Sequence, residues 1–224
     1  GVTVPGDDSQ RMYVWFDALN IYQSGVGFGW DEKSYKKWWP AEVHLIGKGI
    51  IRFHAVYWPA FLLSAKLALP KSLLVHGYIT VEGQKMSKTT GNVVDPLALI
   101  ERYGAEPLRY YLLRDIPSDG DGDFSLAKFE ERYNGELADG LGNLVSRVAA
   151  LGEKISPVKF NFASEVRPVV HEEVDRRFVR YEQAIASFRL HEAIAEIWQL
   201  IGFTDRYLND KKPWFLSDAD ELRK

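Results

Sequence analysis

A polar loop near the middle of the chain carries the residues with the clearest chemical use. Lys85 and Lys88 stand three positions apart, with Gly83 before them and Gly91 after them. Such a loop offers mobile positive charge, and lysine binds phosphate as a compact point charge. It can close over a triphosphate and stabilise the charge that builds on a leaving pyrophosphate. As an isolated pattern this is weak, because most lysine-rich loops are only solvated.

The composition excludes several classes of protein. Of the 224 residues, 46% are apolar and 26% are charged, and the net charge is −3. No basic field covers the molecule, so any contact with RNA must come from local clusters. No apolar run reaches the ~20 residues that cross a bilayer, and no signal peptide is visible, so we expect a cytoplasmic protein without a membrane partner. Because the chain starts at Gly1 without Met, we also expect a fragment.

No pattern indicates a resident metal. The chain has no Cys, which excludes thiolate zinc sites, and its five His are scattered. A calcium loop is also excluded, because Phe124 stands where glycine is required. The acidic residues at calcium-loop spacing are Asp119, Asp121, Asp123 and Glu130. We interpret them as part of a turn before a helix.

Short apolar runs alternate with a helical stretch in the first part of the chain. Strands are predicted over 13–16, 43–46 and 73–75, and a helix over 50–69. Strand, glycine turn, helix and strand in this order are typical of a parallel α/β unit. Ligands of such sheets bind at the carboxyl ends of the strands. Three residues are expected there: Asp17, Gly47 and His76.

The remaining chain is predicted to be a hairpin followed by helices. Glu82 and Gly83 favour a tight hairpin turn, and Asp95 before Pro96 is a strong helix start. Three apolar stripes at helical spacing then predict an antiparallel bundle. The boundary is expected in the acidic loop, which gives a first domain over 1–118 and a helical domain over 119–224.

The lysine loop also carries a resemblance to a known family. Lys85-Met86-Ser87-Lys88-Thr89 resembles the K-M-S-K-S signature of class I aminoacyl-tRNA synthetases, and residues 91–96 (GNVVDP) match that family's usual continuation. The resemblance implies an α/β plus all-α fold. This is the second half of a Rossmann-like parallel sheet with its lysine loop, followed by a helical anticodon-binding domain. The family's H-I-G-H motif is absent, so we expect a piece of a larger enzyme that is inactive by itself.

Two further segments resemble methionyl-tRNA synthetases in particular, namely 13–19 (YVWFDAL) and 47–54 (GKGIIRFH). The resemblance implies a methionine pocket whose aromatic walls would suit a thioether. Its residues would be Trp15, Ala18, Leu19, Tyr22, Ile50, His54 and Trp58. Without the resemblance these would be ordinary core aromatics. A class I synthetase for leucine, isoleucine, valine or cysteine is the alternative within the same class.

The resemblance also implies ATP, with Mg²⁺ entering alongside it and no zinc in this chain. Lys85 and Lys88 would act on the pyrophosphate by electrostatics. The full set of expected ATP contacts is Gly47, His76, Gly77, Ile79, Lys85, Ser87 and Lys88. One position departs from the family, because Gly49 stands where a carboxylate commonly helps to hold the ribose.

The helical part contains the expected tRNA contacts. Residues 142–147 (GNLVSR) resemble the family's anticodon-reading helix, and residues 207–214 (YLNDKKPW) resemble the segment with its base-stacking Trp. Asn143, Arg147 and Trp214 would therefore contact the anticodon of a methionine-accepting tRNA, by hydrogen bonding and stacking. Trp214 could equally be packed on the bundle. A non-catalytic tRNA-binding module is the alternative outside the enzymes, and the oligomeric state is not indicated.

Overall fold

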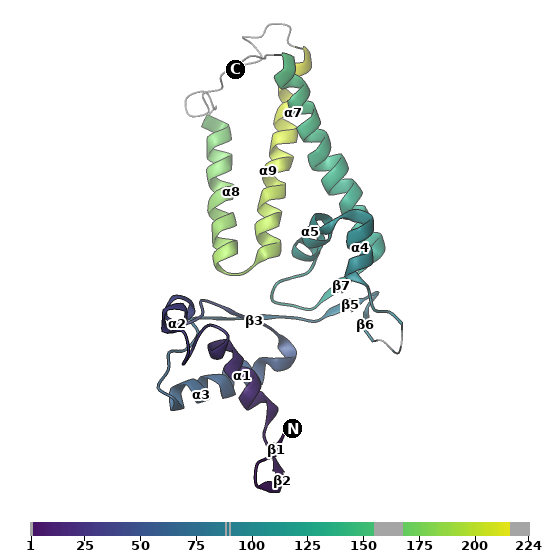
Figure 1. Ribbon diagram of the computed structural model, residues 1–224. Coiled ribbons are helices and arrows are strands. Elements are labelled where there is room, and N and C mark those ends of the chain that lie inside the picture. Colours follow the sequence, from purple (N-terminus) through teal and green to yellow (C-terminus); the bar gives the residue numbers. More distant parts are fainter. Residues whose placement is uncertain (1, 88, 90, 155–167, 216–224) are drawn as a thin grey trace. The chain divides into compact units, whose positions relative to one another are not determined.

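The computed structural model describes residues 2–87, 89, 91–154 and 168–215. The fold is α/β, with small sheets and mostly helices (Figure 1). The chain divides into two compact units, Gly1–Tyr78 and Ile79–Lys224. This division falls earlier in the chain than the predicted domain boundary near residue 118. The predicted boundary separates a catalytic domain from an anticodon-binding domain, and it stays a prediction. Within the described residues, no helix is both long and apolar enough for a membrane crossing.

The first unit is built on a pair of parallel strands. β3 (His44–Gly47) pairs with β4 (Leu73–His76), and Gly47 lies opposite His76 at their carboxyl ends. This confirms the predicted second and third strands. A short antiparallel pair, β1 (Thr3–Val4) and β2 (Asp7–Arg11), precedes them.

The predicted first strand over residues 13–16 is wrong. Residues 14–16 instead form the start of the helix α1 (Val14–Ser24), which places Asp17 in its first turn rather than at a strand end. A short aromatic run has no periodicity of its own. The helix prevails because Trp15, Leu19 and Tyr22, at spacings of four and three, fall on one face, and this face packs in a core cluster.

The predicted helix over 50–69 is present but divided. It comprises the 3₁₀ turn η1 (Lys48–Ile50), the π-helical turn η2 (Phe53–Tyr57) and α3 (Trp58–Ser64). The helix ends earlier than predicted. α2 (Glu32–Trp38) starts at Asp31, whose side chain accepts a hydrogen bond from the Ser34 amide at 3.1 Å. A cluster of buried hydrophobic residues in this unit consists of Leu19, Trp39, Trp58 and Leu62.

The second unit begins with a three-stranded sheet in the order β6-β5-β7. β5 (Ile79–Val81) and β6 (Gln84–Lys85) form the predicted hairpin, and its turn residues Glu82 and Gly83 have φ angles of 50° and 73°. Positive φ at both turn positions matches the twist of a two-residue hairpin. β7 (Gly122–Phe124) lies parallel to β5. The acidic loop therefore ends in a strand that sequence patterns did not predict.

Two helices pack on this sheet. α4 (Pro96–Tyr103) begins as predicted, because the Asp95 carboxylate accepts a hydrogen bond from the Leu97 amide at 2.9 Å. It ends at Gly104, which has a φ of 88°. The same glycine is also the N-cap residue of α5 (Ala105–Asp115). The buried core here consists of Leu108, Tyr111, Phe124 and Phe129.

The described residues after β7 are mostly helical, as predicted. α6 (Leu126–Glu131), the π-helix η3 (Arg132–Gly142) and α7 (Asn143–Lys154) form one continuous rod in Figure 1. α8 (Pro168–Ala186) and α9 (Leu190–Lys211) form a helical hairpin, and η4 (Pro213–Phe215) follows. A Cβ on Gly140 of η3 would lie 3.2 Å from the Trp198 ring of α9. Glycine therefore permits close packing between the two helices.

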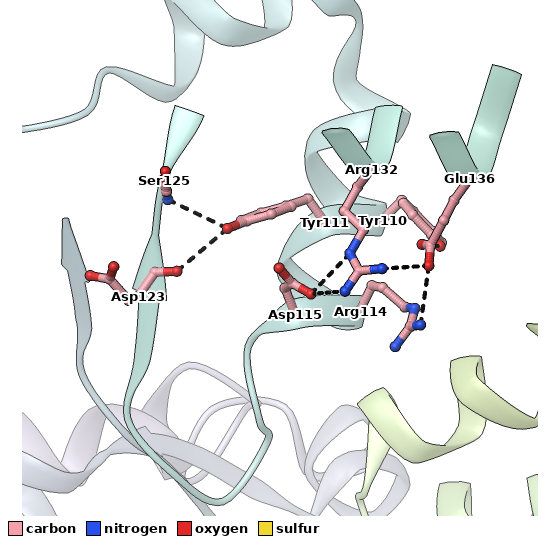
Figure 2. Close-up of polar contacts among 8 residues, drawn as sticks. All are labelled: Tyr110, Tyr111, Arg114, Asp115, Asp123, Ser125, Arg132 and Glu136. Atoms are coloured by element: carbon pink, nitrogen blue, oxygen red, sulfur yellow. Dashed lines mark hydrogen bonds and ion pairs between the residues drawn. The ribbon is translucent and has the colours of Figure 1, made fainter. Parts of the chain in front are cut away.

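A half-buried polar network joins α5 to η3 (Figure 2). Arg132 donates to Asp115 through Nε and Nη2, at 3.2 and 3.0 Å, and to Glu136 through Nη1 at 2.7 Å. Arg114 donates to the same Glu136 oxygen at 3.1 Å, and the Tyr110 hydroxyl donates to the other. Burial raises the pKa of Tyr110, and the hydrogen bond to Glu136 raises it further. The network ties the first turns of η3, the middle segment of the rod, to α5.

Candidate functional site

An aromatic wall forms where α1 packs on η2. The indole of Trp15 stacks on the ring of Phe53, with centroids 4.0 Å apart and planes 8° apart. It also meets the ring of His54 edge-on at 6.0 Å. One turn along the same face of α1, Leu19 is fully buried beneath this wall. The packing of α1 on η2 therefore brings together the predicted residues Trp15, Leu19 and His54.

The imidazole of His54 is held by two hydrogen bonds. Its Nδ1 lies 3.0 Å from the carbonyl oxygen of Ile50, and its Nε2 lies 2.8 Å from the hydroxyl of Tyr22. A carbonyl can only accept, so Nδ1 carries the proton and Nε2 accepts from the Tyr22 hydroxyl. Burial raises the pKa of Tyr22, which keeps the phenol protonated as this bond requires. The lone pairs on the Tyr22 oxygen can still accept a hydrogen bond.

The other predicted pocket residues differ in burial. Trp58 is 1% exposed and its Nε1 has no partner among the described residues, so it serves mainly in the core. Ile50 is half-buried and contributes its carbonyl. Ala18 is exposed on α1, one turn after Trp15. The predicted pocket residues therefore do not share one environment. Some belong to the aromatic wall, and others lie in the core beneath it.

A second imidazole lies behind Tyr22. The ring of His44 meets the Tyr22 ring edge-on at 4.4 Å, and its buried Nε2 has no partner among the described residues. Burial lowers the pKa of His44, and the nearby His54 lowers it further, so His44 stays neutral. A cavity of ≈ 310 Å³ adjoins both imidazoles and is bounded by Pro59 and residues 69–73.

The carboxyl ends of β3 and β4 hold three of the predicted nucleotide contacts. The ring of His76 lies 3.5 Å from the position that a Cβ on Gly47 would take. The Nδ1–H of His76 donates to the carbonyl oxygen of Gly77 at 2.8 Å, which turns the ring along its own backbone. His76 is exposed and Gly77 is buried. Gly47, His76 and Gly77 therefore lie together at one sheet edge, whereas Ile79 belongs to the second unit.

The lysine loop follows β6 in the second unit, and one amide side chain organises it. Asn92 Nδ2 donates to the carbonyl oxygen of Lys85 at 3.1 Å, and Asn92 Oδ1 accepts from the Ser87 amide at 2.9 Å. The Ser87 hydroxyl in turn accepts from the Thr89 amide at 3.2 Å. Lys85 is exposed, as predicted. Lys88 lies outside the described residues.

The hairpin that carries this loop is anchored by Asp123 of β7. Its Oδ1 accepts from the Thr80 hydroxyl at 2.6 Å and from the Gly83 amide at 2.8 Å. The hydrogen bond from Thr80, followed by that from Gly83, lowers the pKa of Asp123 below its usual value. The carboxylate is thus ionised and fixes the turn from which the lysine loop emerges.

The three predicted tRNA contacts converge in the second unit. Arg147 lies with its guanidinium 5.2 Å from the centroid of the Trp214 ring. It donates to Asp205 at 2.7 Å and to Asn209 at 2.8 Å, both on α9. Asn143 and Arg147 line the same cavity of ≈ 610 Å³ between η3, α7 and α9. The open cavity and the 38% exposure of the indole leave these groups accessible to a ligand.

Comparison with known proteins decides the family. The family model described as tRNA synthetases class I (M) matches residues 1–149. The chain belongs to this family of class I tRNA synthetases. That confirms the family predicted from the lysine loop, while the functions of single residues stay predictions.

The relatives of this synthetase chain are named for methionine. Methionine–tRNA ligase of Thermotoga maritima is 42% identical over 231 residues, and methionine–tRNA ligase 1 of Bacillus anthracis is 43% identical over 231 residues. Both alignments cover 100% of this chain but 36% and 35% of the relatives, so the chain spans about a third of their length. The solved structure of Mycobacterium tuberculosis methionyl-tRNA synthetase in complex with methionyl-adenylate is 40% identical, with a TM-score of 0.86. That match covers 100% of this chain and 45% of the solved chain.

Sequence reasoning missed four residues that shape the sites of this synthetase chain. Asn92 had a local signal, because a short amide after glycine commonly bonds to nearby backbone in a turn. Phe53 and His44 gave none beyond their aromatic character. Asp123 could not be found locally, because its partners lie some forty residues earlier in the chain.

Proposed function

We propose that this chain supplies the methionine pocket, the pyrophosphate-binding loop and the anticodon contacts of a methionine–tRNA ligase. Methionine and ATP would give methionyl-adenylate and pyrophosphate, and the methionyl group would then pass to the 3′ end of tRNA. The observation that carries the proposal is the aromatic wall of Trp15 and Phe53 beside the hydrogen-bonded Tyr22–His54 pair. It occurs in a chain whose relatives are named for this reaction.

The pocket chemistry suits a thioether. A sulfur beside an aromatic ring contributes about 0.3–1.5 kcal/mol, and Trp15 and Phe53 offer a stacked pair of rings. The Tyr22 proton is committed to His54 Nε2, so the phenol is fixed in orientation before any ligand binds. A fixed dipole beside the rings would favour the polarisable sulfur of methionine over the methylene of an aliphatic analogue. Leucine and isoleucine would also lose the sulfur–ring contacts.

For the first chemical step we propose an electrostatic function for the lysine loop. Lys85 and Lys88 would neutralise the charge that develops on the departing pyrophosphate, and the Asn92 clamp would limit the conformations of the loop backbone. Among the described residues no cluster of His, Cys, Asp or Glu could hold a metal ion. Mg²⁺ is proposed to enter as part of the ATP complex, held by phosphate oxygens.

For tRNA recognition we propose that Trp214 stacks on an anticodon base beside the guanidinium of Arg147. Base stacking on an aromatic side chain contributes about 1–3 kcal/mol. Asp205 and Asn209 orient the guanidinium, and Asn143 shares its cavity, where an amide can bond to a base edge. We propose the second half of a Rossmann-like sheet in the first domain, a helical anticodon-binding domain after it, and the cytoplasm as compartment.

Methionine-dependent exchange between ATP and pyrophosphate tests the proposed activity, in a protein extended to the length of its relatives. His54→Ala is expected to raise the KM for methionine at least tenfold with little change in the KM for ATP. His171→Ala, a matched change at an exposed position of α8, should alter neither constant. Stronger exchange with leucine, isoleucine, valine or cysteine than with methionine would refute the amino-acid assignment.

Gel shift of this chain tests the tRNA contacts. Arg147→Ala is expected to weaken binding of a tRNA with a CAU anticodon about tenfold, while Arg180→Ala at an exposed position of α8 should not. Wild-type chain that bound a CAU tRNA and an anticodon mutant equally would remove the anticodon function of Asn143, Arg147 and Trp214.

A further inference from the structure

The space beside Gly49 is taken by a neighbouring side chain, and its own backbone does not call for glycine. It lies in η1, and its φ is not in the left-handed region. A Cβ on Gly49 would nevertheless stand 2.6 Å from the hydroxyl oxygen of Tyr78 and 3.6 Å from Cζ of the same ring. The first distance is shorter than any real contact, and the second is ordinary. The hydroxyl alone therefore occupies the space that a side chain at position 49 would need.

The two residues meet at the carboxyl-terminal edge of the parallel strands, where ligands of such sheets commonly bind. Gly47 and His76 are paired at the ends of β3 and β4, and Gly49 and Tyr78 each follow two residues later. The ammonium of Lys48 lies 4.5 Å over the Tyr78 ring and holds it toward η1. Tyr78 is 48% exposed, so part of this residue faces solvent at this edge.

We propose that the Tyr78 hydroxyl, seated over Gly49, is the group with which this chain binds the ribose of the nucleotide. It would take the place of the carboxylate that the family resemblance leads one to expect at position 49. A phenol can donate and accept at one oxygen, as a ribose hydroxyl does, so the two can pair in either direction. This inference rests on the proposed function, because the nucleotide must bind at this edge of the sheet.

The test uses steady-state exchange in the protein extended to the length of its relatives. Tyr78→Phe is expected to raise the KM for ATP about five- to tenfold, because one hydrogen bond to the nucleotide is lost. The KM for methionine should be unchanged. The variant should also lose most of its preference for ATP over 2′-deoxy- and 3′-deoxy-ATP. In the Tyr78→Phe background a Cβ at position 49 has room, because the ring Cζ, at 3.6 Å, is then the nearest atom of that side chain. Gly49→Asp should therefore restore the KM for ATP.

Gly49→Ala is the matched steric control. With Tyr78 present it should displace the hydroxyl and raise the KM for ATP, whereas with Tyr78→Phe it should have little further effect. Active enzyme whose KM for ATP and deoxynucleotide preference are unchanged by Tyr78→Phe would overturn this inference and leave the proposed function standing. Wild-type protein without methionine-dependent exchange would overturn both.

Discussion

The hydrogen bond between Tyr22 and His54 leads to a prediction that can be tested on this chain directly. Tyr22→Phe removes the only donor seen at His54 Nε2 among the described residues, and His54 is 4% exposed. Leaving a buried acceptor without its partner costs about 1–3 kcal/mol. His54 cannot recover by changing tautomer, because an unprotonated Nδ1 would then face the carbonyl oxygen of Ile50 at 3.0 Å. We therefore expect the full destabilisation.

Urea unfolding followed by tryptophan fluorescence measures this loss of stability. For a chain of this size, each kcal/mol also corresponds to about 2–4 °C in Tm. Tyr13→Phe provides the control, because Tyr13 is 56% exposed and contacts Phe53 only through its ring. Nitrogen-15 NMR of His54 should show a protonated Nδ1 and an unprotonated Nε2 in the wild-type chain. An unchanged unfolding midpoint together with a protonated Nε2 would refute the assigned hydrogen-bond direction.

Three further predictions concern the loop, the buried imidazole and the π-helix. Asn92→Ala should accelerate hydrogen exchange of the Ser87 amide measured by NMR, whereas Asn92→Asp keeps the acceptor and should preserve protection; equal rates would argue against the clamp. Because the pKa of His44 is lowered on folding, its contribution to stability is complete above an unfolded pKa of about 6.5. That contribution is lost as the pH falls below this value, so urea midpoints should decline on acidification and decline less in His44→Phe. Gly140→Ala should cost about 1–3 kcal/mol by overpacking the α9 indole, while Gly135→Ala, with open space around it, should be neutral or slightly stabilising by thermal unfolding.

Local signals were sufficient wherever a residue acts through its immediate neighbours. The carboxylate of Asp95 caps α4, and the positive φ angles of Glu82 and Gly83 form the hairpin turn. The cap at Asp95 and the turn at Gly83 follow from residue type, whereas the positive φ of Glu82 does not. The lysine loop with its continuation was long and specific enough to give the family, which the comparisons confirm. Functions of single residues remain predictions.

Residues 13–16 show where sequence reasoning fails and why. Four apolar residues are too short to display a period, so strand and helix cannot be told apart within them. The wider spacing of Trp15, Leu19 and Tyr22 would have favoured a helix. The choice is made by packing, because a helix places all three on the face that meets η2 and the core.

The sequence by itself determined the family, the two parallel strands, the helix cap and the apolar faces of the helices. Each of these depends on residues that are close together along the chain. Only the tertiary structure decided which of the candidate residues have partners. Asp123 anchors a hairpin some forty residues earlier, Arg147 is paired with Asp205 of another helix, and Tyr78 occupies the space over Gly49. These contacts join residues that are distant along the chain, and no local preference encodes such distances. They exist because hydrophobic packing brings the elements together and so places these polar groups within reach of one another.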